Sequence, residues 1–166
     1  MRWILGVLSL ILILLGVGSL SAKSNISPQV DVVASISRLT QEDYERVGTN
    51  GINDPTIDDF RCFKLRVEIK NSKYVSNKEL EVPEISNFKE VLTTDRYWFG
   101  DGVYQNNDGE NLSLAETNFV IYYRGLNEEQ LKEILGPSKI HIGWVSREGN
   151  KIEKEYMLKD FLTFDN

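Results

Sequence analysis

The chain is predicted to fold as a mainly β protein, an antiparallel sandwich with one short helix, preceded by an N-terminal apolar helix. Short runs of alternating apolar and polar residues recur along residues 30–166, bounded by glycine, asparagine, aspartate or proline. About seven such runs, with turn signals roughly every ten residues, are typical of a sandwich that is immunoglobulin-like in the broad sense. Ahead of them, residues 3–22 form a run of 20 residues without a charged side chain.

The first 22 residues, MRWILGVLSLILILLGVGSLSA, predict a membrane segment. As a helix, the uncharged run would be roughly 30 Å long, which is the thickness of a bilayer's hydrocarbon core. Two interpretations stay open. Residues 1–22 are either a retained transmembrane anchor, with Trp3 among the headgroups, or a signal peptide cut after Ser21 or Ala22. The expected location is the cell membrane, single-pass with the C-terminal domain outside, or, after signal cleavage, the secreted fraction.

The rest of the chain is expected to be a spacer, residues 23–29, and one extracytoplasmic β-sandwich domain, residues 30–166. Without residues 1–22 the chain has 18 basic and 25 acidic side chains, a net charge of −7. These charges are interspersed, whereas a nucleic-acid-binding module would carry a basic stripe, so nucleic acid is excluded as a partner. Cys62 is the only cysteine in the sequence, so an intrachain disulfide is excluded. It also lies too far from the N-terminal segment to carry the lipid anchor of a lipoprotein.

The first half of the domain predicts three strands and a short helix. A first strand begins near Val30, and Thr40 is expected to cap a helix that ends before Gly48. A loop over residues 49–59 follows. The clearest strand comes next, because four apolar residues alternate strictly with charged ones: Phe63, Leu65, Val67 and Ile69. Residues 80–88 predict a weaker strand, which Pro83 confines to a sheet edge or a bulge.

The second half predicts a central strand, a helix and a hairpin. Residues 97–99 and 103–104 flank Gly100-Asp101-Gly102, which is expected to be a turn or bulge within a strand pair. Residues 119–123 are apolar on both faces and predict a central strand. Asn127 is expected to cap a short helix that Gly136 ends. Two strands, 140–144 and 152–158, then form a hairpin.

Aromatic residues provide the candidate binding site, which consists of Tyr97, Trp98, Phe99 and Tyr104. An exposed group of such rings could stack on a sugar or grip a protein partner, although a core-facing strand would explain the same residues. Because neighbouring side chains of a strand point to opposite faces, Trp98 is expected to face away from Tyr97 and Phe99.

No catalytic residue, cofactor or metal site is predicted. The only histidine, His141, is expected on the outward face of its strand. The asparagine-rich turn at residues 106–110 does not match an EF-hand, because Tyr104 occupies the first ligand position. Another kind of calcium site there stays an open alternative, using Asp101, Asp108 or Glu110. A hydrolase would need carboxylates that converge in a cleft, and the candidates for that test are Asp58, Glu81, Asp101 and Glu116.

Residues 118–144, NFVIYYRGLNEEQLKEILGPSKIHIGW, resemble a strand–short helix–strand pattern in uncharacterised exported or membrane-anchored small proteins of Gram-positive bacteria. The matching markers are residues 122–126, Gly136 and Trp144. The resemblance implies the sandwich fold and the location, and it brings no activity with it.

The expected function is that of a membrane-anchored or secreted, non-catalytic binding or interaction domain. Its expected partners are the membrane, through residues 3–22 if these are not cleaved, and an envelope protein or a glycan. Two alternatives stay open: an accessory subunit of a membrane complex, and a carboxylate-dependent hydrolase.

Overall fold

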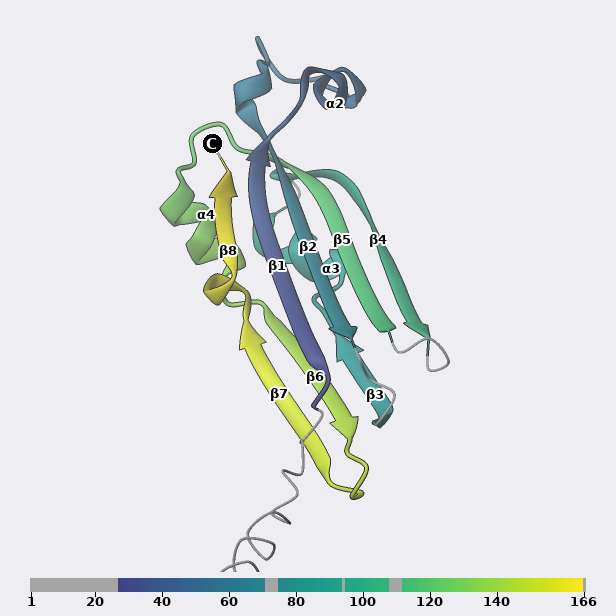
Figure 1. Cartoon of the computed structure of the whole chain (residues 1–166). Helices are drawn as coiled ribbons and strands as arrows, with labels where there is room; N and C mark the ends of the chain where they lie inside the picture. Colours follow the sequence, from purple (N-terminus) through teal and green to yellow (C-terminus); the bar gives the residue numbers. More distant parts are fainter. Residues whose placement is uncertain (1–26, 71–74, 94, 108–111, 166) are drawn as a thin grey trace, which may run out of the picture.

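The computed structural model describes residues 27–70, 75–93, 95–107 and 112–165, with the backbone alone for residues 104–107. They form a mainly β structure with two sheets (Figure 1). The five-stranded sheet has the order β4 (Tyr97–Asn107), β5 (Leu112–Tyr122), β2 (Phe60–Lys70), β1 (Gln29–Arg38) and β8 (Leu162–Asp165). The three-stranded sheet has the order β3 (Ser76–Glu81), β6 (Lys139–Val145) and β7 (Lys151–Met157).

All strand pairs are antiparallel except β1 with β8, which run parallel. As spatial neighbours, β1, β2, β5 and β4 follow one another in one sheet, and β3, β6 and β7 in the other. Constant-type immunoglobulin sandwiches have this same order, with strands A, B, E and D opposite C, F and G. The prediction of a mainly β, antiparallel fold is therefore confirmed, whereas the prediction of one short helix is wrong, because the described residues contain three α-helices. The strand β8 is an addition at the β1 edge.

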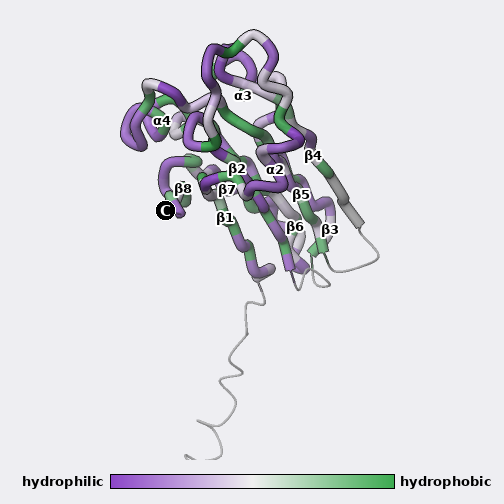
Figure 2. Tube along the Cα trace, turned by 90° about the horizontal axis from the view of Figure 1, so that it is seen from above, coloured by the Kyte–Doolittle hydropathy of each residue, from purple (hydrophilic) through white to green (hydrophobic). Residues whose placement is uncertain are grey.

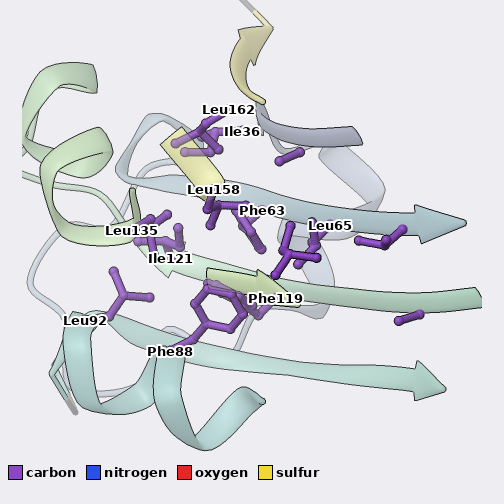
Figure 3. Packing of buried hydrophobic residues seen from close by; sticks show 14 of the residues in the cluster. Ile36, Phe63, Leu65, Phe88, Leu92, Phe119, Ile121, Leu135, Leu158 and Leu162 are labelled. Atoms are coloured by element: carbon purple, nitrogen blue, oxygen red, sulfur yellow. The ribbon is translucent and has the colours of Figure 1, made fainter. Parts of the chain in front are cut away.

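One face of the five-stranded sheet packs on the three-stranded sheet and on two helices, α3 (Ile85–Leu92) and α4 (Glu128–Leu135) (Figure 1). The predicted alternation produces this core, because Phe63, Leu65, Val67 and Ile69 of β2 are all at most 2% exposed. Figure 2 shows hydrophobic and hydrophilic residues interspersed along β1, of which Ala34 and Ile36 are the buried ones. At the centre, the Phe119 ring lies 4.6 Å from that of Phe63 and 5.0 Å from that of Phe88 (Figure 3).

The helix α3 corrects the sequence prediction of a strand over residues 80–88. The strand β3 ends at Glu81, and Pro83 separates it from the helix. Glu84 then begins α3 with a capping box to Asn87. The apolar stripe of α3 has helical spacing: Ile85 packs against the core, and Phe88 and Leu92 lie within it. This spacing was present in the sequence, but the apolar residues Leu80, Val82 and Ile85 also fit the pattern of a strand.

Two other helices confirm their predicted caps. Thr40 caps α2 (Gln41–Arg46), and its side chain accepts a hydrogen bond from the backbone N–H of Asp43. Asn127 caps α4 and accepts one from the N–H of Gln130.

A second, smaller core lies on the other face of the five-stranded sheet. It consists of Leu39, Val47, Phe60 and Val120, with Tyr44, Trp98 and Tyr122 packed around them. The segment between β1 and β2, which contains α2, covers this end of the sheet. Phe60 and Val120 lie on the outer side of their strands, so this segment is what buries them.

The membrane segment, residues 1–22, and most of the spacer lie outside the described residues. Within the part of the chain that the structure describes, no helix is long and apolar enough to cross a membrane. The predicted turn at residues 106–111 also falls largely outside the described ranges. Its two flanks pair as expected, with Asn107 opposite Leu112.

Candidate functional site

The four predicted binding residues lie on β4, but they do not form one exposed aromatic group. Tyr97 is 8% exposed, and its ring packs 5.3 Å from that of Phe119 in the main core, so Tyr97 is not available to a partner. Trp98 is half-buried in the second core: its Nε1–H donates a 2.7 Å hydrogen bond to the carbonyl oxygen of Gly48. Phe99 is 45% exposed. The backbone of Tyr104 pairs with Ala115, and its side chain is outside the described part.

A β-bulge explains why simple alternation failed here. Tyr97 pairs with Ile121, and Phe99 pairs with the adjacent residue of β5, Val120. An advance of two residues along β4 therefore corresponds to one residue along β5. A bulge of this kind puts two residues opposite one and changes the direction of the side chains. Tyr97 faces the main core, whereas Trp98 packs on the opposite face of the sheet, where Phe99 also lies. The sequence-based expectation that Trp98 and Phe99 lie on opposite faces is therefore wrong.

Residues 100–102 were expected to form a turn or a bulge, but β4 runs through them as one strand and its bulge lies just before them, between Tyr97 and Phe99. Gly100 allows this because its backbone lies very close to β5. A Cβ built on Gly100 would be 2.2 Å from the carbonyl oxygen of Asn118 and 2.3 Å from the Cβ of Phe119.

Replacing Gly100 should therefore destabilise the protein. For Gly100→Ala we expect a loss of about 2 kcal/mol in the free energy of unfolding, because the new methyl group would push β4 away from β5. Gly48→Ala is the control, since nothing lies within 4 Å of a Cβ at Gly48. Urea denaturation measures both, and equal losses for the two variants would contradict the close approach at Gly100.

The strand β4 is one of four strands that lie at the edge of a sheet. Within the described ranges no strand pairs with its outer side. It has 11 residues and one charged side chain, Asp101, whereas the seven residues of β7 include four charged ones. The edge strand β3 has three charged residues in six, and β8 is only four residues long. Proteins protect sheet edges from pairing by charges or short length, so β4 is the least protected edge.

The outer face of the five-stranded sheet differs from this edge because its polar groups already bind one another. Arg66 forms ion pairs with Glu68 and Glu116, and Lys70 forms ion pairs with Glu68 and Asp31. Hydrogen bonds from Lys70 and Arg66 hold the pKa of Glu68 below its usual range. Next to this network, two apolar side chains of β4 are exposed: Phe99 and Val103, which is 57% exposed.

A cleft of about 620 Å³ opens between the three-stranded sheet and the helices α3 and α4. Its apolar side includes Val91 of α3 and Ile134 of α4, and its polar side includes Glu81, His141 and Glu155. These last three form one cross-strand row, because Glu81 pairs with His141 and His141 with Glu155. The prediction that His141 points away from the core is confirmed, since its neighbours Ile140 and Ile142 are both fully buried.

The next row of this sheet contains Glu79, Gly143 and Glu153. Glu79, His141 and Glu153 each offer one ligand atom, and these atoms all lie within 4.8 Å of one another. The sequence prediction did not find this group, because β3 and β6 are far apart in the chain. Lys151 forms ion pairs with both glutamates, and its hydrogen bond to Glu153 holds the pKa of Glu153 below its usual range.

The four carboxylates named for a hydrolase do not come together. Glu81 lines the cleft, whereas Asp101 and Glu116 lie in β4 and β5 of the other sheet, and Glu116 binds Arg66. Asp58 lies in the 3-10 turn Ile57–Asp59, ahead of β2. Arg96, which flanks the aromatic residues in the sequence, donates hydrogen bonds to the carbonyl oxygens of Tyr122 and Arg124.

Comparison with known proteins adds no relative: no protein-family model, curated protein or solved structure matches the chain.

Proposed function

We propose that this chain is an immunoglobulin-like interaction domain, carried to the outer side of a membrane by residues 1–22, that binds an extended segment of a protein partner along β4. The partner segment adds a strand to the five-stranded sheet, so that the backbone of β4 provides hydrogen bonds and its side chains provide selectivity.

The unprotected edge of β4 carries the proposal. An exposed strand edge presents N–H and C=O groups in a row, and a long edge without charges is prone to pair with another chain. The bulge at Tyr97 and Phe99 affects only the start of β4, and the register is regular from Phe99 to Asn107. This leaves nine residues for a partner strand, more than the typical strand of about five or six residues needs.

The side chains of β4 indicate the chemistry of the partner. Phe99 and Val103 lie on one face of the sheet, with Asp101 between them in the same row of alternate residues. An incoming strand with apolar side chains at alternate positions would cover both. A glycan platform fits less well, because Tyr97 is buried and the Trp98 N–H already has a partner within the protein.

Site-specific photo-crosslinking tests this function in the cells that make the protein. A photoreactive amino acid replaces Phe99 or Val103. The control replaces Lys64, which is also exposed on the outer face of the same sheet but lies on β2 and is paired on both sides, with Ser35 and with Asn118. We expect the same protein adduct from positions 99 and 103 and none from position 64. An adduct with a second copy of this chain would identify self-association instead of a partner protein. Equal labelling at all three positions, or none at 99 and 103, would contradict the proposal.

The proposed location outside the membrane is part of the same proposal and rests on residues 1–22. N-terminal sequencing of the mature protein distinguishes a retained anchor from a cleaved signal peptide. A chain that begins near Ala22 or Lys23 is secreted after cleavage, whereas an intact N-terminus indicates the anchor, which the accessory-subunit alternative also requires.

A further inference from the structure

We propose that Glu79, His141 and Glu153 form a binding site for a zinc-class divalent cation on the outer face of the three-stranded sheet. The site is separate from the β4 edge and independent of the function proposed for it. Each of the three strands contributes one ligand: β3 provides Glu79, β6 provides His141 and β7 provides Glu153.

The type of ligand selects the class of metal. One imidazole nitrogen and two carboxylate oxygens suit Zn²⁺, whereas Ca²⁺ and Mg²⁺ prefer oxygen ligands alone. In a tetrahedral zinc site, bonds of about 2.0–2.2 Å place neighbouring ligand atoms roughly 3.4 Å apart. The ligand atoms here lie within 4.8 Å of one another. Glu79 and Glu153 have side chains about half exposed, so small rotations can bring them closer.

Gly143 makes room for this arrangement. It lies between the two glutamates in the cross-strand row, paired with Glu79 on one side and Glu153 on the other. A Cβ built on Gly143 would lie 3.1 Å from Oε2 of Glu79. A larger residue would thus occupy the space in which the carboxylate of Glu79 lies.

The lysine beside the site shows that the two carboxylates already converge on one cation. The ammonium group of Lys151 forms an ion pair with Glu153 and lies 3.9 Å from Oε2 of Glu79. A metal ion would displace this ammonium group, and the repulsion between the two cations must weaken metal binding. Removal of Lys151 should therefore strengthen it, which random binding to surface carboxylates would not predict.

The site also borders the cleft between the sheet and the helices, because His141 lines both. Three protein ligands leave a coordination position free on a tetrahedral zinc ion. A second ligand with an oxygen or nitrogen donor can then reach the metal from the cleft.

Isothermal titration of the full chain, kept in mild detergent, with Zn²⁺ tests the site. We expect saturable binding of one Zn²⁺ per chain at micromolar concentration and no comparable binding of Ca²⁺. His141→Gln should weaken Zn²⁺ binding at least tenfold, and Lys151→Met should strengthen it roughly tenfold. Glu129→Gln on α4, a glutamate outside the site, is the control and should leave the Kd unchanged.

Several results would overturn the proposal: no Zn²⁺ binding, equal affinity for Ca²⁺, or an unchanged Kd in His141→Gln. Thermal unfolding of each variant checks that the sheet is intact. If His141→Gln does not fold, Glu153→Gln takes its place, because the Glu153 side chain is about half exposed and its loss removes one ligand without opening the core.

Discussion

Phe119→Ala should lower the free energy of unfolding by about 3–5 kcal/mol, the largest effect expected of any single substitution discussed for this protein. The Phe119 side chain is 2% exposed, and its ring contacts three other aromatic rings, those of Phe63, Phe88 and Tyr97. These rings come from β2, α3 and β4, so the substitution leaves a cavity where the sheet and a helix meet (Figure 3).

Urea denaturation followed by tryptophan fluorescence measures this loss. The control is Phe99→Ala in the neighbouring strand, where the same atoms are removed from a side chain that is 45% exposed. We expect Phe99→Ala to cost less than about 1 kcal/mol. If Phe119→Ala does not fold, Phe119→Leu should, with a smaller loss. Similar losses for Phe99→Ala and Phe119→Ala would contradict the placement of Phe119 in the core.

Arg124→Met should cost about 2–3 kcal/mol and should loosen the loop ahead of β2 first. The guanidinium group of Arg124 donates hydrogen bonds to both carboxylate oxygens of Asp59, at 2.8 and 2.7 Å. It also donates to the carbonyl oxygens of Asn53 and Asp54, at 2.9 and 2.7 Å. One side chain thus ties this loop to the end of β5. Its loss leaves the Asp59 carboxylate, which is 13% exposed, without its main partner.

Amide hydrogen exchange should show the effect at residues 49–59 before the rest of the domain. Arg46→Met is the control, because the ion pair between Arg46 and Glu42 is exposed on both sides and such pairs contribute little. Faster exchange across the whole domain, without a preference for this loop, would contradict the local role of Arg124.

The same contact predicts how stability depends on pH. The hydrogen bonds from Arg124, and then those from Thr56, hold the pKa of Asp59 well below its usual range. Asp59 therefore contributes stability that is fully present above the pKa of an unfolded aspartate, about 3.9, and is lost as the pH falls below it. In Asp59→Asn the stability should decline less steeply between about pH 4 and pH 2. An identical slope in both proteins would show that Asp59 has no such role.

Local patterns in the sequence were enough for much of the fold. The strict alternation in β2 predicted its buried face. When one face of a strand is buried and the other is solvated, a shift of one residue would expose all the apolar side chains, so only one register is stable. The caps Thr40 and Asn127 predicted where α2 and α4 begin, since their hydrogen bonds involve residues three positions away. The prediction failed at residues 80–88, where the apolar residues fit both the period of a strand and that of a helix. A short apolar run is compatible with either element.

The candidate sites depended on contacts that the sequence does not show. The hairpin of β6 and β7 would have placed Gly143 opposite Glu153, because its turn sets the register. Nothing local places Glu79 beside them, however, since β3 joins β6 through a contact between distant parts of the chain. The edge position of β4 is likewise a property of the whole sheet, and the bulge that puts Phe99 on the same face as Trp98 forms only against β5.

The sequence by itself determined the mainly β class, the caps of two helices and the buried faces of the main strands, because these follow from neighbours a few residues apart. It also set the acidic net charge of the domain and the uncharged run of residues 3–22. Only the tertiary structure decided that β4 is an open edge and that Glu79, His141 and Glu153 meet on one sheet face. Both depend on strand order, which is set by the packing of the two sheets into a common core.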